Sequence, residues 1–228
     1  LVVLKESEPS ISAKEQNYLA NSVPPGQKLR VFSGGIKDVK PILQSSTFWL
    51  ITISYSAYLS IWWGIVTWVP QYLNIARGFS LESLGWVASI PYGAAALGVA
   101  LGGIISDRLA KRSVFGVVGL AGASIFILLA ATIPSNALAA ALVVSAPVFN
   151  QMFYAPVWTV VQSTFPAHLM GTGTGLVNGI GNLASAIAPV IIGVLIQISG
   201  SYGVGLMYLT AFGILGALSS VVMMRRGY

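Results

Sequence analysis

The sequence contains no cysteine, one histidine and few charged residues. Without cysteine there is no disulfide bond and no thiolate chemistry. One histidine and six acidic residues supply no credible set of metal ligands, and we expect neither a metal nor another cofactor. Charged residues make up 8% of the 228 residues, whereas soluble domains carry about 25%. These absences exclude a disulfide-stapled scaffold and argue against a water-soluble domain.

Charge is missing above all from the second half of the chain. No Asp, Glu, Lys or Arg occurs from Ser113 to Met224, and 55% of all residues are hydrophobic. The mean hydropathy is +0.80. A formal charge of +6 would suit a nucleic acid, but six of the twelve Lys and Arg precede Pro41 and five lie at 108–112 and 225–226. The composition therefore indicates a lipid bilayer, and not a nucleic acid, as the partner.

Six apolar runs are long enough to cross a bilayer as helices, which takes about 20 residues each. Strands are not expected, because the membrane strands of barrels are only about 10 residues long. The sequence thus predicts an all-α membrane protein with six transmembrane helices. The predicted spans are 47–73, 84–106, 113–133, 137–165, 171–198 and 203–224.

The basic residues predict the orientation of these spans. With six crossings, eleven of the twelve Lys and Arg fall on one side, and Arg77 alone falls on the other. We therefore expect both ends of the segment to be cytoplasmic, in the plasma membrane. The polar stretch 1–40 is predicted to be a flexible cytoplasmic segment, with 31–44 either an amphipathic surface helix or a plain linker. The chain starts with Leu and not Met, so we expect Leu1 to be an internal point of a longer protein.

The predicted span 84–106 combines small residues with a charged end. Gly98, Gly102 and Ser106 lie four residues apart, so one helix face can approach a neighbouring backbone closely. A short loop follows, and its charges are Asp107, Arg108, Lys111 and Arg112.

This loop resembles the signature loop of the major facilitator superfamily of secondary transporters, which follows the second helix of each six-helix half. The matching residues read Gly103-x-x-x-Asp107-Arg108-x-x-Lys111-Arg112, with Ala110 where the family usually has Gly. The resemblance implies that 41–228 is one half of a twelve-helix transporter and that 1–40 resembles the central loop. The partner half, with six helices, would then precede this sequence.

The resemblance also implies a conformational latch, formed by Gly103, Asp107, Arg108 and Arg112. We expect Asp107 to pair with Arg108 or Arg112 and to face the other half. The alternative is an ordinary positive-inside loop, in which an exposed pair contributes about 0–1 kcal/mol.

Polar residues inside the span 171–198 recur every three or four positions and form one stripe. Its members are Gly171, Gly175, Asn178, Asn182, Ser185, Pro189 and Gly193. We expect the glycines to permit close helix contact and the two carboxamides to bind a polar ligand. Alternatively, Asn178 and Asn182 hydrogen-bond to a neighbouring helix, which contributes about 0.6–2 kcal/mol each.

Two further spans carry polar and aromatic faces. The span 137–165 has Gln151, Tyr154, Trp158 and Gln162 on one face, with Pro147 and Pro156 permitting bends. The span 47–73 has Tyr55, Tyr58 and Trp62 on one face. Each is either a cavity lining or an aromatic helix–helix seam. The predicted binding residues for a small-molecule substrate are Asn178, Trp158, Tyr154, Asn182, Tyr55, Tyr58 and Gln151.

Two short patterns resemble the anion–cation symporter branch of the superfamily. They are Trp68-Val-Pro70-Gln-Tyr72-Leu73 and Gly175-Leu-Val-Asn178-Gly-Ile-Gly-Asn182. The resemblance implies transport of an organic anion, such as a sugar acid or another carboxylate, together with protons. It also implies that Trp158 and Asn178 line the substrate cavity.

No predicted span contains Asp, Glu, Lys or Arg. A proton site and a positive partner for an anion would therefore lie in the other half. The same absence fits a uniporter of a neutral solute. A non-transporting membrane sensor or scaffold and a channel stay open. An enzyme is not expected, because the one histidine, His168, lies in a loop where we expect a surface residue.

Overall fold

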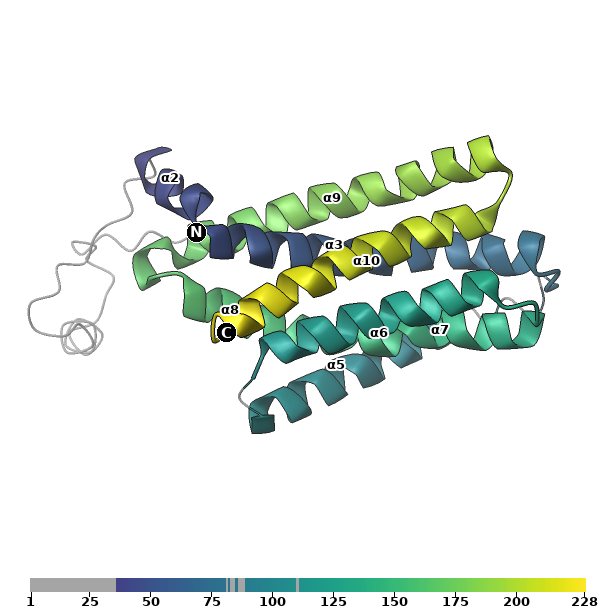
Figure 1. Ribbon diagram of the computed structural model, residues 1–228, viewed down its shortest axis with the longest axis horizontal. Coiled ribbons are helices and arrows are strands. Elements are labelled where there is room, and N and C mark those ends of the chain that lie inside the picture. The colour runs from purple at the N-terminus through teal and green to yellow at the C-terminus, as the bar shows by residue number, and fades with distance from the viewer. Residues whose placement is uncertain (1–35, 81, 83–84, 86–88, 110) are drawn as a thin grey trace, which may run out of the picture. The chain divides into compact units, whose positions relative to one another are not determined.

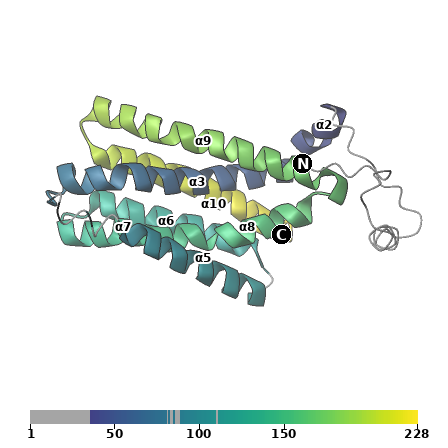
Figure 2. The ribbon, with the colours of Figure 1, turned by 180° about the vertical axis from the view of Figure 1, so that it is seen from behind.

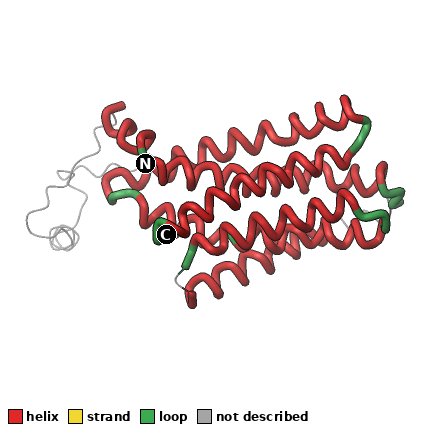
Figure 3. The backbone as a smooth tube through the Cα atoms, in the orientation of Figure 1, coloured by secondary structure: helices red, strands yellow, loops and turns green. Residues whose placement is uncertain are grey.

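The computed structural model describes residues 36–80, 82, 85, 89–109 and 111–228. The described chain is helical, with short turns and no strand within these residues (Figure 3). This confirms the predicted all-α fold class. Most of the predicted cytoplasmic segment 1–40 lies outside the described residues. The end of that segment, with the residues just after it, forms helix α2, Ile36–Gln44.

Six helical segments are long and apolar enough to cross a membrane. They lie close to the predicted spans, although the start of the second span is only partly described. In chain order they are α3 (Ser46–Gln71) with the π-helical turn η1 (Tyr72–Ala76), α5 (Ile90–Leu109), α6 (Ser113–Thr132), α7 (Asn136–Met152) with α8 (Tyr154–Thr164), the 3-10 turn η2 (Ala167–Leu169) with α9 (Met170–Ser199), and α10 (Tyr202–Arg225).

Local sequence explains where several helices begin and end. Ser45 and Ser135 cap α3 and α7, since each side-chain oxygen accepts a hydrogen bond from the backbone N–H three residues later, at 3.4 Å. Helix α9 ends at Gly200, whose φ of +67° is a left-handed conformation that glycine adopts without strain.

The helices pack side by side in the order α9, α3, α10, α6, α7, α5 (Figures 1 and 2). Helix α3 lies between α9 and α10, which explains why it is buried along most of its length. The short helix α8 contacts α3, α5, α6 and α9. Residues of α3, α8 and α9 therefore lie close together.

Small residues set the close contact between α5 and α7. Gly98, Gly102 and Ser106 are buried, and a Cβ on either glycine would meet the carbonyl oxygen of Val148 or Met152 in α7. The predicted small-residue face of this span is therefore confirmed. The Met152 carbonyl also lacks its usual helical donor, because Pro156 has no N–H. The α7 backbone thus lies directly against α5 at the point where the helical hydrogen bonds of α7 are interrupted.

The predicted glycine contacts of α9 are borne out in part: a Cβ on Gly193 would lie 3.1 Å from the Trp68 ring of α3, whereas Gly171 and Gly175 make no such contact within the described residues. No described atom lies within 4 Å of a Cβ built on Gly171 or Gly175. The contacts are made instead by Gly173, against Phe165, and by Gly181, against Tyr55. The spacing placed Gly171 and Gly175 on one face with the asparagines, but in this part of α9 the buried face is the neighbouring one.

The substitution Gly102→Ala should lower thermal stability, because the added methyl would force α5 and α7 apart. Overpacking of this kind costs about 1–3 kcal/mol, so we expect the melting temperature in detergent to fall by several degrees. Gly93→Ala is the matched control on the same helix, since no described atom lies within 4 Å of its Cβ. Equal melting temperatures for the two variants would contradict the close α5–α7 contact.

Candidate functional site

All seven predicted binding residues lie in one connected cluster. Two come from α3, one from the end of α7, two from α8 and two from α9. Each is joined to at least one of the others by a hydrogen bond or a ring contact. The members of this binding cluster are Tyr55, Tyr58, Gln151, Tyr154, Trp158, Asn178 and Asn182.

Two stacked tyrosines form the back of the cluster. Tyr55 and Tyr58 lie about one turn apart on α3, with ring centroids 5.8 Å apart. Each is only 4% exposed, because α3 is the central helix. Their rings are thus fixed by packing, and only their hydroxyl groups reach the polar side chains of other helices.

Each tyrosine hydroxyl donates a hydrogen bond to a side-chain amide oxygen. Tyr55 donates to Asn178 Oδ1 at 3.0 Å, and Tyr58 donates to Gln151 Oε1 at 2.7 Å. The amide nitrogens, Asn178 Nδ2 and Gln151 Nε2, form no hydrogen bond with any described residue. At these two amides the oxygens are therefore occupied and the N–H donors are free.

Asn182 fixes the amide of Asn178 further. Its Nδ2 donates to both Asn178 O and Asn178 Oδ1, each at 2.8 Å. Asn178 Oδ1 thus accepts two hydrogen bonds, one from Tyr55 and one from Asn182. Both asparagines lie on an exposed face of α9. Asn178 nevertheless bonds to the neighbouring helix α3 through Tyr55, as the packing alternative expects, whereas the side chain of Asn182 bonds only within α9.

Aromatic rings complete the cluster on the side of α8. Trp158 meets Tyr55 edge to face at 5.1 Å, and Tyr154 lies 6.0 Å from Tyr58. Tyr154 is 42% exposed and is the first residue of α8, just after a turn at Phe153. This turn lies three residues before Pro156, which has no N–H and so interrupts the helical hydrogen bonds. Beyond the turn, the exposed ring of Tyr154 lies beside the buried Tyr58.

One residue of this region was not predicted. Asn150 is fully buried, and its Nδ2 donates to the backbone oxygen of Tyr58 at 3.2 Å. The sequence signal that could have identified Asn150 was a carboxamide in an uncharged span, but this residue lies off the helix face of Gln151 and Tyr154.

Two residues of the predicted faces lie outside the cluster. Trp62 packs on Tyr92, and Gln162 is exposed.

The predicted latch residues lie at the charged end of α5. Asp107 and Arg108 are exposed, Arg112 is half-buried, and Ala110 lies outside the described residues. Within the described chain, Asp107 forms no ion pair with Arg108 or Arg112, and the buried Nε of Arg112 has no hydrogen-bond partner. The expected pair is therefore not formed in this structure. His168 is exposed in η2, as expected.

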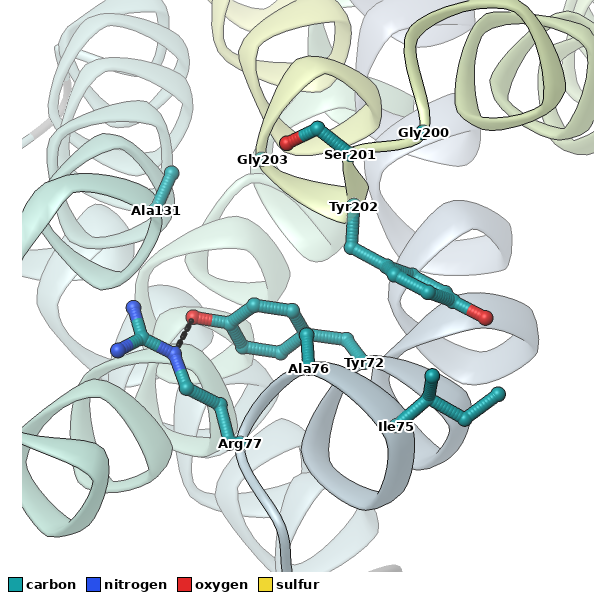
Figure 4. A pocket seen from close by; sticks show the side chains of 9 residues that line it. All are labelled: Tyr72, Ile75, Ala76, Arg77, Ala131, Gly200, Ser201, Tyr202 and Gly203. Atoms are coloured by element: carbon teal, nitrogen blue, oxygen red, sulfur yellow. Dashed lines mark hydrogen bonds between the residues drawn. The ribbon is translucent and has the colours of Figure 1, made fainter.

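A pocket of about 320 Å³ lies at the other end of the bundle, beside Arg77 (Figure 4). Arg77 donates from Nε to the Tyr72 hydroxyl at 2.7 Å and from its terminal nitrogens to the Ala130 and Pro134 oxygens and to Asn136 Oδ1. Tyr72 also donates to Ala130 O, at 2.6 Å. These bonds join η1 to the α6–α7 turn, so the guanidinium here serves as a structural tie.

The W-x-P-x-Y-L pattern belongs to the same end. Trp68 Nε1 donates to Pro189 O at 3.0 Å and its ring lies 6.4 Å from that of Tyr202. With Tyr72 bound to Ala130, the pattern connects α3 to α6, α9 and α10. In the described residues the pattern therefore holds helices together.

Comparison with known proteins agrees with this architecture. The family model described as Major Facilitator Superfamily matches residues 3–189. A probable sulfoacetate transporter of Cupriavidus necator is 33% identical over 182 residues, which cover 76% of this chain and 42% of that protein. A probable galactarate/D-glucarate transporter of Bacillus subtilis is 31% identical over 193 residues, covering 81% of this chain and 42% of that protein.

A third relative extends the match over nearly the whole chain. It is a probable galactarate/D-glucarate transporter of Escherichia coli K12, 28% identical over 230 residues, with 94% of this chain and 51% of that protein covered. The chain thus spans about half the length of these relatives.

Replacing Arg77 should loosen the end of the bundle that it ties. Arg77→Gln removes the hydrogen bonds that the guanidinium donates to four oxygens. A typical hydrogen bond contributes about 0.5–1.5 kcal/mol to the free energy of unfolding. We expect a clear fall in melting temperature in detergent. Lys111→Gln is the matched control, because it removes the same charge from an exposed side chain with no hydrogen bond to a described residue. If both variants melt alike, the bonds of Arg77 add nothing to stability.

Proposed function

Because this chain belongs to the major facilitator superfamily, we propose that it forms one half of a secondary transporter for a small organic anion, such as a sugar acid. The other half, with six helices, is the partner that completes the substrate pathway. The coupling ion is proposed to be a proton, and transport proceeds by alternating access between the two halves.

The observation that carries this proposal is the polarity of the binding cluster. The hydroxyls of Tyr55 and Tyr58 occupy the amide oxygens of Asn178 and Gln151, so at these two amides the free groups are N–H donors. Carboxylates and sulfonates present only acceptor oxygens, and hydrogen bonds to charged groups are about twice as strong as neutral ones. A site rich in free donors therefore suits an oxygen-rich anion.

The aromatic rings suit the rest of such a molecule. Trp158 and Tyr154 contact the rings of the two tyrosines that bind the amides. Their aromatic faces can pack against a carbon skeleton while the donors bind its oxygens. The relatives named above as transporters of galactarate, D-glucarate and sulfoacetate support an anion of this size.

The binding cluster supplies no positive charge. Its described members include no Lys, Arg or His, and an anion in a membrane interior needs a cationic partner. We therefore assign the cation, and the ionisable group of proton coupling, to the other half. The same lack of charge is what a uniporter of a neutral solute would show, and transport specificity decides between them.

The two buried tyrosines are proposed to act behind the substrate. Their hydroxyl hydrogens are committed to the amides, and their rings are almost fully covered. Direct contact is assigned to Asn178, Gln151, Trp158 and Tyr154, while Asn182 orients Asn178.

Uptake into proteoliposomes tests the proposed function. The full-length protein should accumulate at least one of galactarate, D-glucarate and sulfoacetate when an inward proton gradient is imposed. A neutral hexitol is the matched control. Uptake of the hexitol alone would instead establish a transporter of neutral solutes.

Variants of Asn178 test the role of its donors. Asn178→Asp keeps the acceptor, removes both N–H donors and adds a negative charge, so we expect KM for the anion to rise more than tenfold. Asn178→Ala should raise KM less, and Asn182→Ala should raise it least. An Asp variant that binds the anion as tightly as the wild type would contradict the donor role.

The charged end of α5, with Asp107 and Arg108, is proposed to be part of a cytoplasmic latch that pairs with the other half. Asp107 is exposed and without an ion pair in this half, so it is free to meet a partner there. Asp107→Ala should lower the transport rate severalfold with little change in KM. Glu82→Ala removes an exposed carboxylate on the opposite side and should change neither. Normal turnover at normal expression in the Asp107 variant would contradict the latch.

A further inference from the structure

We propose that Gly181 is a positioning residue of the substrate site, because its missing side chain allows the Tyr55 hydroxyl to reach Asn178. The inference rests on the proposed function, in which the Asn178 amide contacts the substrate. It assigns to a residue without functional groups the control of how that amide is presented.

The ring of Tyr55 lies directly against the α9 backbone at Gly181. A Cβ at this position would be 2.5 Å from Tyr55 Cδ1, 2.8 Å from its Cε1 and 3.4 Å from Leu59 Cδ1. The first two distances are far below van der Waals contact. Any side chain at position 181 therefore has to displace the Tyr55 ring.

The ring has no free space into which it could move. Trp158 lies edge to face at 5.1 Å, Tyr58 is stacked at 5.8 Å, and Tyr55 is 4% exposed. Asn178 and Gly181 are three residues apart and so lie on adjacent turns of α9. The ring thus covers Gly181 while its hydroxyl reaches Asn178 Oδ1 at 3.0 Å. A displaced ring would lengthen or misalign this bond.

The backbone itself does not require glycine at this position. Gly181 lies in the middle of α9, and the described glycines with positive φ are elsewhere, at 78, 200 and 227. Glycine in a helix interior is disfavoured relative to alanine. Space for the Tyr55 ring is therefore the physical reason for glycine here.

Uptake kinetics of matched glycine variants test the inference. The probe is radiolabelled galactarate, D-glucarate or sulfoacetate, whichever the full-length wild type transports fastest. Gly181→Ala should raise KM about three- to tenfold, the effect of losing one hydrogen bond, with kcat within about twofold. Gly179→Ala, which has no described atom within 4 Å of its Cβ, should match the wild type. An unchanged KM in Gly181→Ala overturns the proposal.

Tyr55→Phe separates positioning from general packing, since it keeps the ring and removes only the hydroxyl. It should raise KM as Gly181→Ala does, and the double variant should be no worse than either single one. If Tyr55→Phe leaves KM unchanged, or if the two effects multiply, Gly181 does not act through the hydroxyl.

A spectroscopic measurement keeps this test separate from the proposed function. With 3-fluorotyrosine at position 55, the ¹⁹F resonance should shift in Gly181→Ala and stay in place in Gly179→Ala. An unshifted resonance in Gly181→Ala overturns the positioning role even if transport is normal. If the wild type transports none of the three anions, the proposed function fails, while the ¹⁹F comparison still decides whether Gly181 positions Tyr55.

Discussion

Neutral hydrogen bonds donated by side chains hold the binding cluster together, in a region where no charge is available. Tyr55 and Tyr58 on α3 each donate to an amide on another helix, and Asn150 returns a bond to the α3 backbone. In a nonpolar environment an unpaired polar group is costly, so each of these bonds restricts its partners strongly. The same bonds orient the amide N–H groups, so packing and the presentation of the site have one cause.

Close backbone contact is the second condition on which the architecture depends. Helix–helix association in lipid gains little from the hydrophobic effect and relies on van der Waals packing through small residues. Gly98 and Gly102 bring α5 against α7, and Gly181 brings the Tyr55 ring against α9. Gly98 and Gly102 therefore serve helix packing, and Gly181 serves the binding cluster. The backbone conformation requires glycine at none of these positions.

The sequence was sufficient for the helices and for most of the cluster. Apolar run length predicted the spans, and spacing of three or four residues placed Tyr55 with Tyr58 and Asn178 with Asn182 on shared faces. Those faces are local properties of a helix and can be derived without knowing its neighbours. The cluster forms because the helices carrying these faces pack around α3.

What the sequence could not supply was the direction in which each face points. The first part of the stripe, with Gly171 and Gly175, proved to be exposed, whereas Ser185 further along it is buried. Asn150 was missed for a related reason: it faces α3 from a position off the aromatic stripe. The ion pair expected for Asp107 depends on side-chain partners across a loop, and helical spacing carries no information about them.

The concentration of charges at the helix ends has an electrical consequence. Moving one elementary charge through a membrane potential involves about 2.3 kcal/mol per 100 mV. The long apolar helices of this half carry their Asp and Arg side chains only at their ends, as with Asp107, Arg108 and Arg225. When such a bundle tilts, the membrane voltage performs almost no work on its side chains, so voltage can act only through whatever charge moves elsewhere.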